Sequence, residues 1–205
     1  MCIKRFRYTP ENVKCEYCTA YCGRKIRCRL SQCPWLAERI EAGTVTYAEA
    51  VRSIIPKFCL YQDRIEHLFR EYDGSFWLNN AHKNNMQWFN HQLGYVPGRN
   101  TNAYYAAMYL LTSNANLHRR TANCFYSRGI EFSYAVLQNI SPHNYAIFCG
   151  ASELYNQQRT VTDSELADPE IIDDTAFRLL INAKLIAKYG TCVFGLQKEL
   201  ASDGE

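Results

Sequence analysis

Five of the ten cysteines in this chain lie between Cys15 and Cys33, and this cluster constrains the fold more than any other feature. The segment around it is polar and has few branched aliphatic residues, so it is a poor place to bury five reduced thiols. The N-terminus is basic and runs into Tyr8-Thr9-Pro10 without an apolar stretch, which predicts no signal peptide and a cytoplasmic protein. In a reducing compartment a dense cysteine cluster is more often a metal site than a disulfide framework. The cluster therefore predicts an N-terminal segment organised by a metal.

The spacing of these cysteines predicts a structural zinc site. Zn²⁺ in such sites takes four tetrahedral thiolate or imidazole ligands, usually supplied as two close pairs. Cys15 and Cys18 form the first pair, and Cys28 and Cys33 form a second, looser pair. Cys22 is a possible substitute for Cys28. We expect Zn²⁺ to be a structural cofactor, because the protein fills all four positions and leaves none open for a substrate.

Other roles for the thiols are less consistent with the sequence. Thiolate spacing does not exclude an iron–sulfur cluster in place of zinc. A redox dithiol at Cys15 and Cys18 lacks the βαβ context of thioredoxin-like proteins. Four further cysteines stand singly in apolar surroundings, where cysteine usually serves as a small core residue: Cys59, Cys124, Cys149 and Cys192.

After the cluster, start and stop signals predict a series of helices. Cys33 is expected at the N-cap of the first one, where the helix dipole favours its thiolate, with Pro34 at the first helical position and Gly43 after the end. A capping box, Thr46-Tyr47-Ala48-Glu49, opens a second helix that ends before Pro56. Further helices are expected at 63–72, 79–93, 102–111, 117–127 and 144–157.

The last predicted helix starts at Asp168 and Pro169 and ends at Gly190. It carries an apolar stripe at helical spacing, made of Ile172, Ala176, Leu179, Ala183 and Ile186. Strands are conceivable only at 44–47, 132–136 and 193–194, and no apolar run approaches the roughly 20 residues that cross a bilayer. The expected fold is mainly α, with a cysteine-rich zinc module and first helix (1–43) packed on an all-α domain (44–205).

Charge is divided unevenly along the chain. Residues 1–33 carry a net charge of +6, residues 34–159 of +2 and residues 160–205 of −5. Cations on a loop held by a metal can neutralise phosphates, and tyrosines can stack on unpaired bases. We therefore expect a nucleic-acid surface at Arg24, Lys25, Arg27 and Arg29, with Tyr17 and Tyr21 beside them.

A second, smaller basic patch extends this expected surface. It consists of His118, Arg119, Arg120 and Arg128, with Phe125 and Tyr126. Two other interpretations of the first patch stay open. It can be a solvated face that keeps a small module soluble, or a contact surface for an acidic protein, including the acidic C-terminal third of another copy.

No catalytic motif is found. The five histidines have no catalytic or metal-binding spacing, and the sequence lacks a P-loop, Gly-x-Gly-x-x-Gly, Gly-x-Ser-x-Gly and His-Glu-x-x-His. Asp173 and Asp174 are explained by the helix dipole, and Tyr104, Tyr105 and Tyr109 by half-buried packing. We expect a binding protein and not an enzyme.

The segment Cys15-x-x-Cys18…Cys28…Cys33-Pro-Trp, with the helix after it, resembles the cysteine-cluster proteins of bacterial conjugative elements and phages. Residues 104–112 and 176–190 are also similar to such proteins. The resemblance implies a mobile-element context and brings no catalytic residues with it. Small proteins of that setting often act on nucleic acid or inhibit host defence machinery by binding it.

Two functions from different classes follow. The first is a zinc-stabilised accessory protein that binds nucleic acid through the basic, metal-held loop. The second is a protein-interaction module without catalytic activity, such as an inhibitor of a host nuclease or defence complex of the anti-CRISPR kind. Salt-dependent binding to random DNA or RNA favours the first, and co-purification with a protein at high salt favours the second.

Overall fold

The computed structural model describes residues 7–18 and 30–200 of the chain. Helices account for 60% of these described residues and strands for 3%, which confirms the predicted mainly α class. The α-helices are α1 Leu36–Glu41, α2 Tyr47–Arg52, α3 Gln62–Glu71, α4 Asn80–Leu93, α5 Asn102–Leu111, α6 Ala115–Thr121, α7 Pro142–Asn156, α8 Asp163–Ala167 and α9 Asp174–Tyr189. The 3-10 helices are η1 Pro10–Asn12, η2 Cys15–Tyr17, η3 Leu30–Gln32, η4 Ala122–Cys124, η5 Phe132–Tyr134 and η6 Thr191–Gly195. One antiparallel hairpin pairs β1 Phe125–Tyr126 with β2 Gly129–Ile130.

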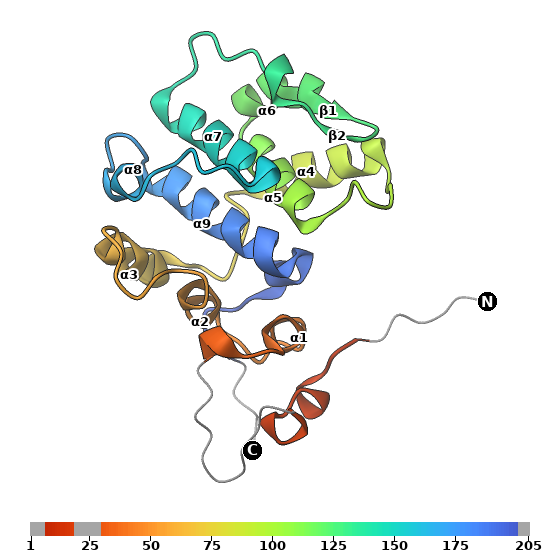
Figure 1. Ribbon diagram of the computed structural model, residues 1–205, viewed down its shortest axis with the longest axis vertical. Coiled ribbons are helices and arrows are strands. Elements are labelled where there is room, and N and C mark those ends of the chain that lie inside the picture. Colours follow the sequence, from red (N-terminus) through yellow and green to blue (C-terminus); the bar gives the residue numbers. More distant parts are fainter. Residues whose placement is uncertain (1–6, 19–29, 201–205) are drawn as a thin grey trace, which may run out of the picture.

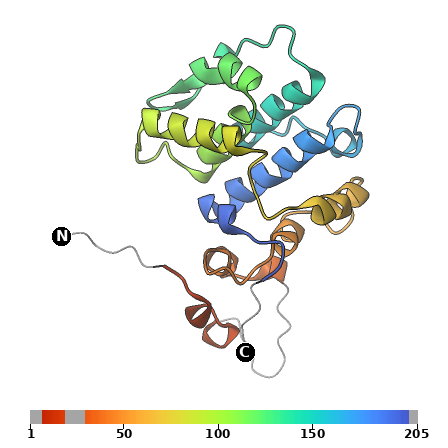
Figure 2. The same cartoon turned by 180° about the vertical axis from the view of Figure 1, so that it is seen from behind.

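The long helix α9 runs through the middle of the molecule (Figure 1). Helices α5 and α7 pack together and against α9 on one side, and α1, α2 and α3 lie on the other. The view from behind shows α4, α6 and the hairpin gathered at the end of the molecule far from α1 (Figure 2). One continuous hydrophobic core extends from Leu36 in α1 to Leu196 after η6. In the described part of the chain, no helix is long and apolar enough to cross a membrane.

Helix α9 shows how local signals and burial combine. The Asp173 carboxylate caps it by accepting from the Ala176 amide at 2.7 Å. Gly190 ends it in the left-handed region, at φ +81°, as predicted. The predicted stripe is buried over its whole length, although Ile172 lies before the helix begins. The stripe therefore gives the fold its central packing surface.

The predicted start of this helix at Asp168 is wrong. Asp168 instead follows α8, a helix that was not predicted and that opens with a capping box between Thr162 and Glu165. Asp168 has extended backbone (ψ 110°), as a residue before proline prefers, so Pro169 separates two helices. The acids at the start of α9 are only Asp173 and Asp174.

Two other predicted helix boundaries need correction. Helix α1 begins at Leu36, and its first hydrogen bond runs from the Arg39 amide to the Trp35 carbonyl. Cys33 is therefore not the N-cap. The helix expected at 117–127 ends at Thr121, because the chain turns through η4 into the hairpin.

The strands were predicted at the wrong positions. Residues 132–134 and 191–195 form 3-10 helices, and the segment 44–47 contributes only an isolated parallel bridge between Thr46 and Gln197. That bridge, with the Tyr47 amide donating to the Gln197 carbonyl at 2.9 Å, holds the segment after η6 against the start of α2. The capping box predicted at Thr46 and Glu49 is confirmed.

Candidate metal and nucleic-acid binding sites

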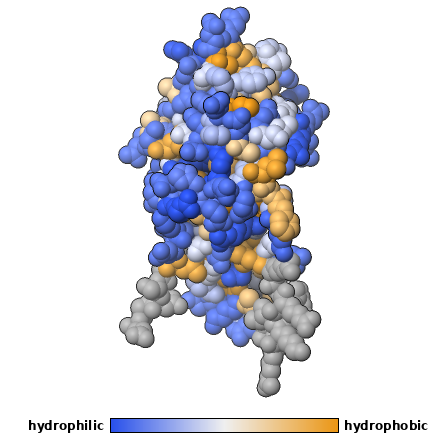
Figure 3. All heavy atoms as spheres, turned by 90° about the vertical axis from the view of Figure 1, so that its left-hand side faces the viewer, coloured by the Kyte–Doolittle hydropathy of each residue, from blue (hydrophilic) through white to orange (hydrophobic). Residues whose placement is uncertain are grey.

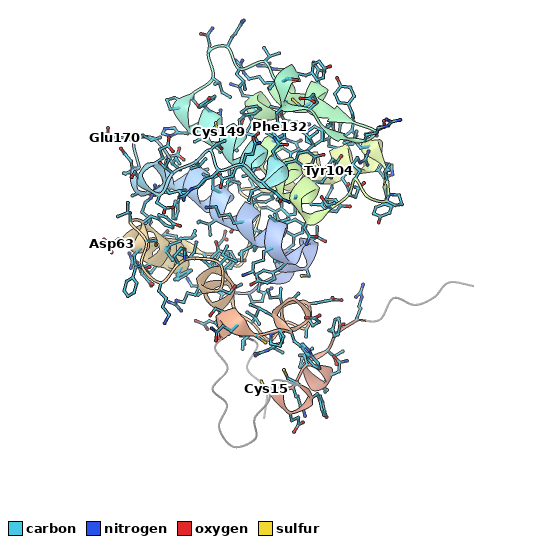
Figure 4. All side chains as sticks on the ribbon, viewed as in Figure 1. Cys15, Asp63, Tyr104, Phe132, Cys149 and Glu170 are labelled. Atoms are coloured by element: carbon cyan, nitrogen blue, oxygen red, sulfur yellow. The ribbon has the colours of Figure 1, made fainter. Side chains whose placement is uncertain are left out.

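Cys15 and Cys18 lie at the two ends of one tight turn. Cys15 opens the 3-10 helix η2, and Cys18 closes it by donating its amide to the Cys15 carbonyl at 3.0 Å. Cys15 is exposed and Cys18 is half-buried. Figure 4 shows Cys15 on a segment beyond α1, away from the helical body. Side chains three residues apart in a 3-10 turn are eclipsed, so this turn suits a pair of ligands on one side.

Cys33 lies where the chain enters the helical body. It is half-buried, packs against the hydrophobic core, and donates its amide to the Leu30 carbonyl at 3.0 Å. Because α1 has six residues and begins three positions later, the helix-dipole argument for a Cys33 thiolate does not hold.

The remaining predicted ligands, Cys22 and Cys28, lie outside the described residues. Within residues 7–18 and 30–200, no group of three or more His, Cys, Asp or Glu side chains is placed to hold a metal. The predicted set of four thiolates combines Cys15, Cys18 and Cys33 with Cys28, or with Cys22 in its place. The zinc site stays a prediction.

The four single cysteines are core residues or pack against the core, as predicted. Burial raises the pKa of Cys124 and of Cys192 to about 11, and nearby Glu41 adds to the effect at Cys192. Burial also raises the pKa of Cys59 and Cys149. All four thiols are therefore protonated near neutral pH, which disfavours metal ligation.

The predicted basic loop lies outside the described part of the chain. This applies to Arg24, Lys25, Arg27, Arg29 and Tyr21. Of that surface only Tyr17 is described, and its ring is exposed at the end of η2. The first nucleic-acid surface stays a prediction.

The second basic patch is described, and its arginines differ in their surroundings. Arg119 on α6 and Arg128 in the hairpin turn are exposed. Arg120 is held in place: its guanidinium donates to Asn116 Oδ1 at 2.6 Å and to the carbonyls of Val136 and Gln138 at 3.0 and 2.6 Å. All of these acceptors are neutral, so Arg120 keeps its full positive charge.

Two members expected in this patch face inward. Phe125 is buried, with its ring edge-on to Phe89 at 4.8 Å between centroids. The His118 ring also lies edge-on to Phe89 at 4.8 Å. Burial lowers the pKa of His118, so it is neutral at pH 7 and adds no charge. The expectation that Phe125 and His118 extend the surface is therefore wrong.

The patch gains a tyrosine that was not predicted. Tyr134 on η5 is 55% exposed, and its ring centroid lies 5.5 Å from that of Tyr126, which is 46% exposed. These rings border a hollow of about 410 Å³ lined by Tyr126, Arg128, Gly129, Ile130, Glu131, Tyr134 and Tyr155. We call Arg119, Arg120, Tyr126, Arg128 and Tyr134 together the hairpin surface.

Around this surface the chain is almost free of carboxylates. Between Asp73 and Glu153 the only acidic residue is Glu131, whereas five are basic: Lys83, Arg99, Arg119, Arg120 and Arg128. Among the described residues, none of these five cations forms an ion pair. The net charge of +2 over residues 34–159 does not show this separation of charge, because that range also contains the acidic residues of α1 to α3. A count in shorter windows reveals it.

Four arginines elsewhere in the fold are paired with carboxylates, whereas Arg39 and Arg70 form no ion pair in the described part of the chain. The N–O distances are 3.7 Å for Arg52–Glu66, 2.9 Å for Arg64–Asp174, 2.8 Å for Arg159–Asp163 and 3.2 Å for Arg178–Asp73. The segment from α4 to the hairpin thus carries five cations without an ion pair in the described part of the chain and a single carboxylate, Glu131. Comparison with protein-family models, with curated proteins and with solved structures finds no match to this chain.

Proposed function

We propose that this chain is a zinc-stabilised accessory protein that binds nucleic acid. The observation that carries the proposal is the contrast between its arginines. Those of α6 and the hairpin have no carboxylate partner in the described part of the chain, whereas four arginines elsewhere do. A phosphate backbone is bound by cations that are not already neutralised. The hairpin surface supplies such cations next to exposed aromatic rings.

The zinc part of the proposal rests on the cysteine turn. Cys15 and Cys18 close a 3-10 turn, and Cys33 marks the entry to the helical body, so a metal held by these thiols joins the N-terminal segment to α1. Bound Zn²⁺ supplies cross-linking and no reaction step. The loop between Cys18 and Cys33 carries Arg24, Lys25, Arg27 and Arg29, and a metal at its two ends reduces the ordering entropy that opposes binding.

The test compares two charge-matched variants of the whole protein. Arg119→Gln with Arg128→Gln removes two unpaired cations, and Arg52→Gln with Arg159→Gln removes two ion-paired ones. We expect the first variant to bind a random-sequence oligonucleotide more weakly, with the slope of log K against log salt reduced by roughly 0.7–0.9 for each phosphate that is no longer neutralised. The second variant should bind like the parent. Equal effects of the two variants exclude the hairpin surface, and no binding by the parent at low salt refutes the proposed function.

A second candidate function has its own observation. In the loop between α2 and α3, Phe58 is 95% exposed and Leu60 is 71% exposed. Figure 3 faces the side on which α3 lies and shows hydrophobic residues at the surface there. Neighbouring exposed large hydrophobic side chains are typical of protein contacts. This favours an interaction module, such as an inhibitor of a host nuclease or defence complex.

Capture from a nuclease-treated host lysate at high salt tests this alternative. The parent is compared with Phe58→Ser/Leu60→Ser and with Val136→Ser, which alters an exposed apolar residue in the segment between η5 and α7. A protein retained by the parent and Val136→Ser but not by the double variant supports the interaction module. Equal retention by all three excludes this loop as the contact.

A further inference from the structure

We infer that the hairpin surface binds single-stranded nucleic acid, with unpaired bases stacked on Tyr126 and Tyr134 and phosphates against Arg119 and Arg128. This inference rests on the proposed function and specifies its ligand. The hairpin surface combines the two groups that such binding uses, which are aromatic rings open to solvent and cations without a carboxylate partner.

The two tyrosine rings are presented and not buried. Their centroids are 5.5 Å apart, their planes are tilted by 52°, and about half of each side chain is exposed to solvent. The core tyrosines behave differently: Tyr47, Tyr72 and Tyr109 are buried and each hydroxyl donates to a protein acceptor. An exposed aromatic pair is available to a flat, apolar partner, and every nucleic-acid base has such a face.

The backbone beneath these rings is fixed from several sides. The Tyr155 hydroxyl accepts from the Ile130 amide at 3.1 Å, and the Glu131 amide donates to the Cys124 carbonyl at 2.8 Å. A Cβ atom at position 129 would collide with the Tyr155 hydroxyl, so glycine permits this close approach. A platform ordered before binding loses less entropy when a ligand arrives.

Tyr134 is tied to α6 in the same way. Two residues after it, the Val136 amide donates to the Arg120 carbonyl at 3.0 Å, and the Arg120 guanidinium donates back to the Val136 carbonyl at 3.0 Å. Arg119 is the neighbour of Arg120 on α6 and is exposed. Helix α6, which carries the proposed phosphate contact Arg119, is thus hydrogen-bonded directly to the segment that follows Tyr134.

The hollow beside the rings suits a base better than a phosphate. Its lining contains the Glu131 carboxylate, which repels an anion and accepts from the Ser133 hydroxyl at 2.9 Å and amide at 3.4 Å. A carboxylate oxygen can also accept from the exocyclic amine of a base, or from the ring N3–H of an unpaired thymine or uracil. Phosphates are therefore directed to the arginines on α6 and in the turn, and a base to the hollow.

The arrangement fits a single strand better than a duplex. A duplex keeps its bases stacked inside, where surface rings do not reach their faces. Duplex readers usually lay a helix or a two-stranded ribbon along the major groove with several side chains reaching base edges. Here the ribbon has only two residues in each strand, and α6 has seven residues with its cations at its last turn.

The experiment measures fluorescence anisotropy with an unstructured oligothymidylate, an oligouridylate and a DNA duplex of equal length. The variants are Tyr126→Ala/Tyr134→Ala, the ring-preserving Tyr126→Phe/Tyr134→Phe, and Tyr145→Ala as an exposed tyrosine on α7. We expect the alanine pair to weaken single-strand binding by roughly 5-fold or more, since stacking on one ring is worth at least about that factor. The salt slope should stay constant, because no phosphate contact is removed. The phenylalanine pair and Tyr145→Ala should bind like the parent.

A second readout uses the unaltered protein and does not depend on how the variants fold. Ultraviolet crosslinking of an oligonucleotide containing 5-iodouracil, followed by mass spectrometry, should mark Tyr126 or Tyr134. This inference is overturned if the parent binds single strand and duplex with equal affinity, the alanine pair binds as tightly as the parent, and the crosslinks fall on other residues. The proposed function would then still stand. Absence of binding to either form overturns both.

Discussion

The Tyr47 hydroxyl donates a 2.7 Å hydrogen bond to Oδ1 of Asn182, and both side chains are fully buried. The Asn182 amide nitrogen in turn donates to the Tyr109 hydroxyl at 3.2 Å and to the Phe76 carbonyl at 3.4 Å. This one asparagine therefore connects α2, α5 and α9 with the segment before α4. It is one of several buried polar side chains, which also include His82, Thr112 and Thr121.

Replacing Asn182 should destabilise the fold. Asn182→Ala leaves the buried Tyr47 hydroxyl without its acceptor, and an unsatisfied buried polar group costs about 1–3 kcal/mol. We expect the midpoint of thermal unfolding to fall by roughly 2–4 °C for each kcal/mol. Tyr47→Phe, which removes the donor and keeps the ring, should have a smaller effect. Equal unfolding midpoints for the parent and Asn182→Ala would contradict this role.

Stability should depend on pH through His82. This ring is buried, its Nε2 lies 2.9 Å from the Tyr109 carbonyl, and burial lowers its pKa to about 4. Above pH 6.5 the imidazole is neutral in the folded and unfolded states. As the pH falls from 6.5 toward 4, only the unfolded state takes up the proton, so stability decreases, by about 2 kcal/mol at pH 5.

Urea unfolding at pH 7 and pH 5 measures this decrease. His82→Gln should remove most of the difference between the two pH values, although it lowers stability at both. A parent protein with the same free energy of unfolding at pH 7 and pH 5 would show that His82 is charged in the fold.

The zinc proposal makes a metal-content prediction. Protein purified without chelator should contain about one zinc ion per chain, bound through Cys15, Cys18, Cys28 and Cys33. Cys18→Ser should lose the metal, and Cys124→Ser, which alters a buried thiol, should keep it. An iron–sulfur absorption spectrum, or a folded protein without metal, would contradict the assignment.

Removal of the metal should destabilise the N-terminal segment up to residue 43 and leave the helical body folded. Since structural zinc contributes its binding free energy to local folding, hydrogen exchange in Cys18→Ser should accelerate up to residue 43. The amides of α5, α7 and α9 should keep their protection, because their packing is apolar. Equal acceleration in all elements would mean that the segment and the helical body form one cooperative unit.

The basic loop can be tested apart from the hairpin surface. Replacing Arg24, Lys25, Arg27 and Arg29 with alanine should weaken nucleic-acid binding at low salt by orders of magnitude. The salt slope should fall, and the zinc content should stay constant. Parent-like affinity and slope in this variant would identify the loop as a solvated face.

Elements with local signals were predictable from the sequence. Thr46 and Glu49 form the expected capping box, Asn102–Leu111 is the expected fifth helix, and Gly190 ends the last helix. Each of these features depends on residues within a few positions of one another. The hairpin was not predictable because two-residue strands have no periodicity, and its support comes from Tyr155 on α7.

For the candidate sites, the sequence predicts which residue types take part but not how their side chains are arranged. Spacing and charge single out the cysteines and the arginines. Which side chains are exposed depends on tertiary packing and is not visible in the sequence. Phe125 is buried because it packs against Phe89, whereas Tyr134 lies exposed beside Tyr126. Arg159 and Asp163 are only four residues apart, so their ion pair is visible in the sequence, whereas that of Arg178 with Asp73 joins distant segments.

The central position of α9 also affects the order in which the protein is completed. The apolar faces of α5 and α7 pack on a helix that leaves the ribosome after both of them. Residues 196 and 197 follow later still, and they accept hydrogen bonds from Tyr72 and from the start of α2. Until then the nascent chain exposes much of its future interior, as partly synthesised chains commonly do. We therefore expect the nascent chain to need protection by chaperones until α9 has left the ribosome.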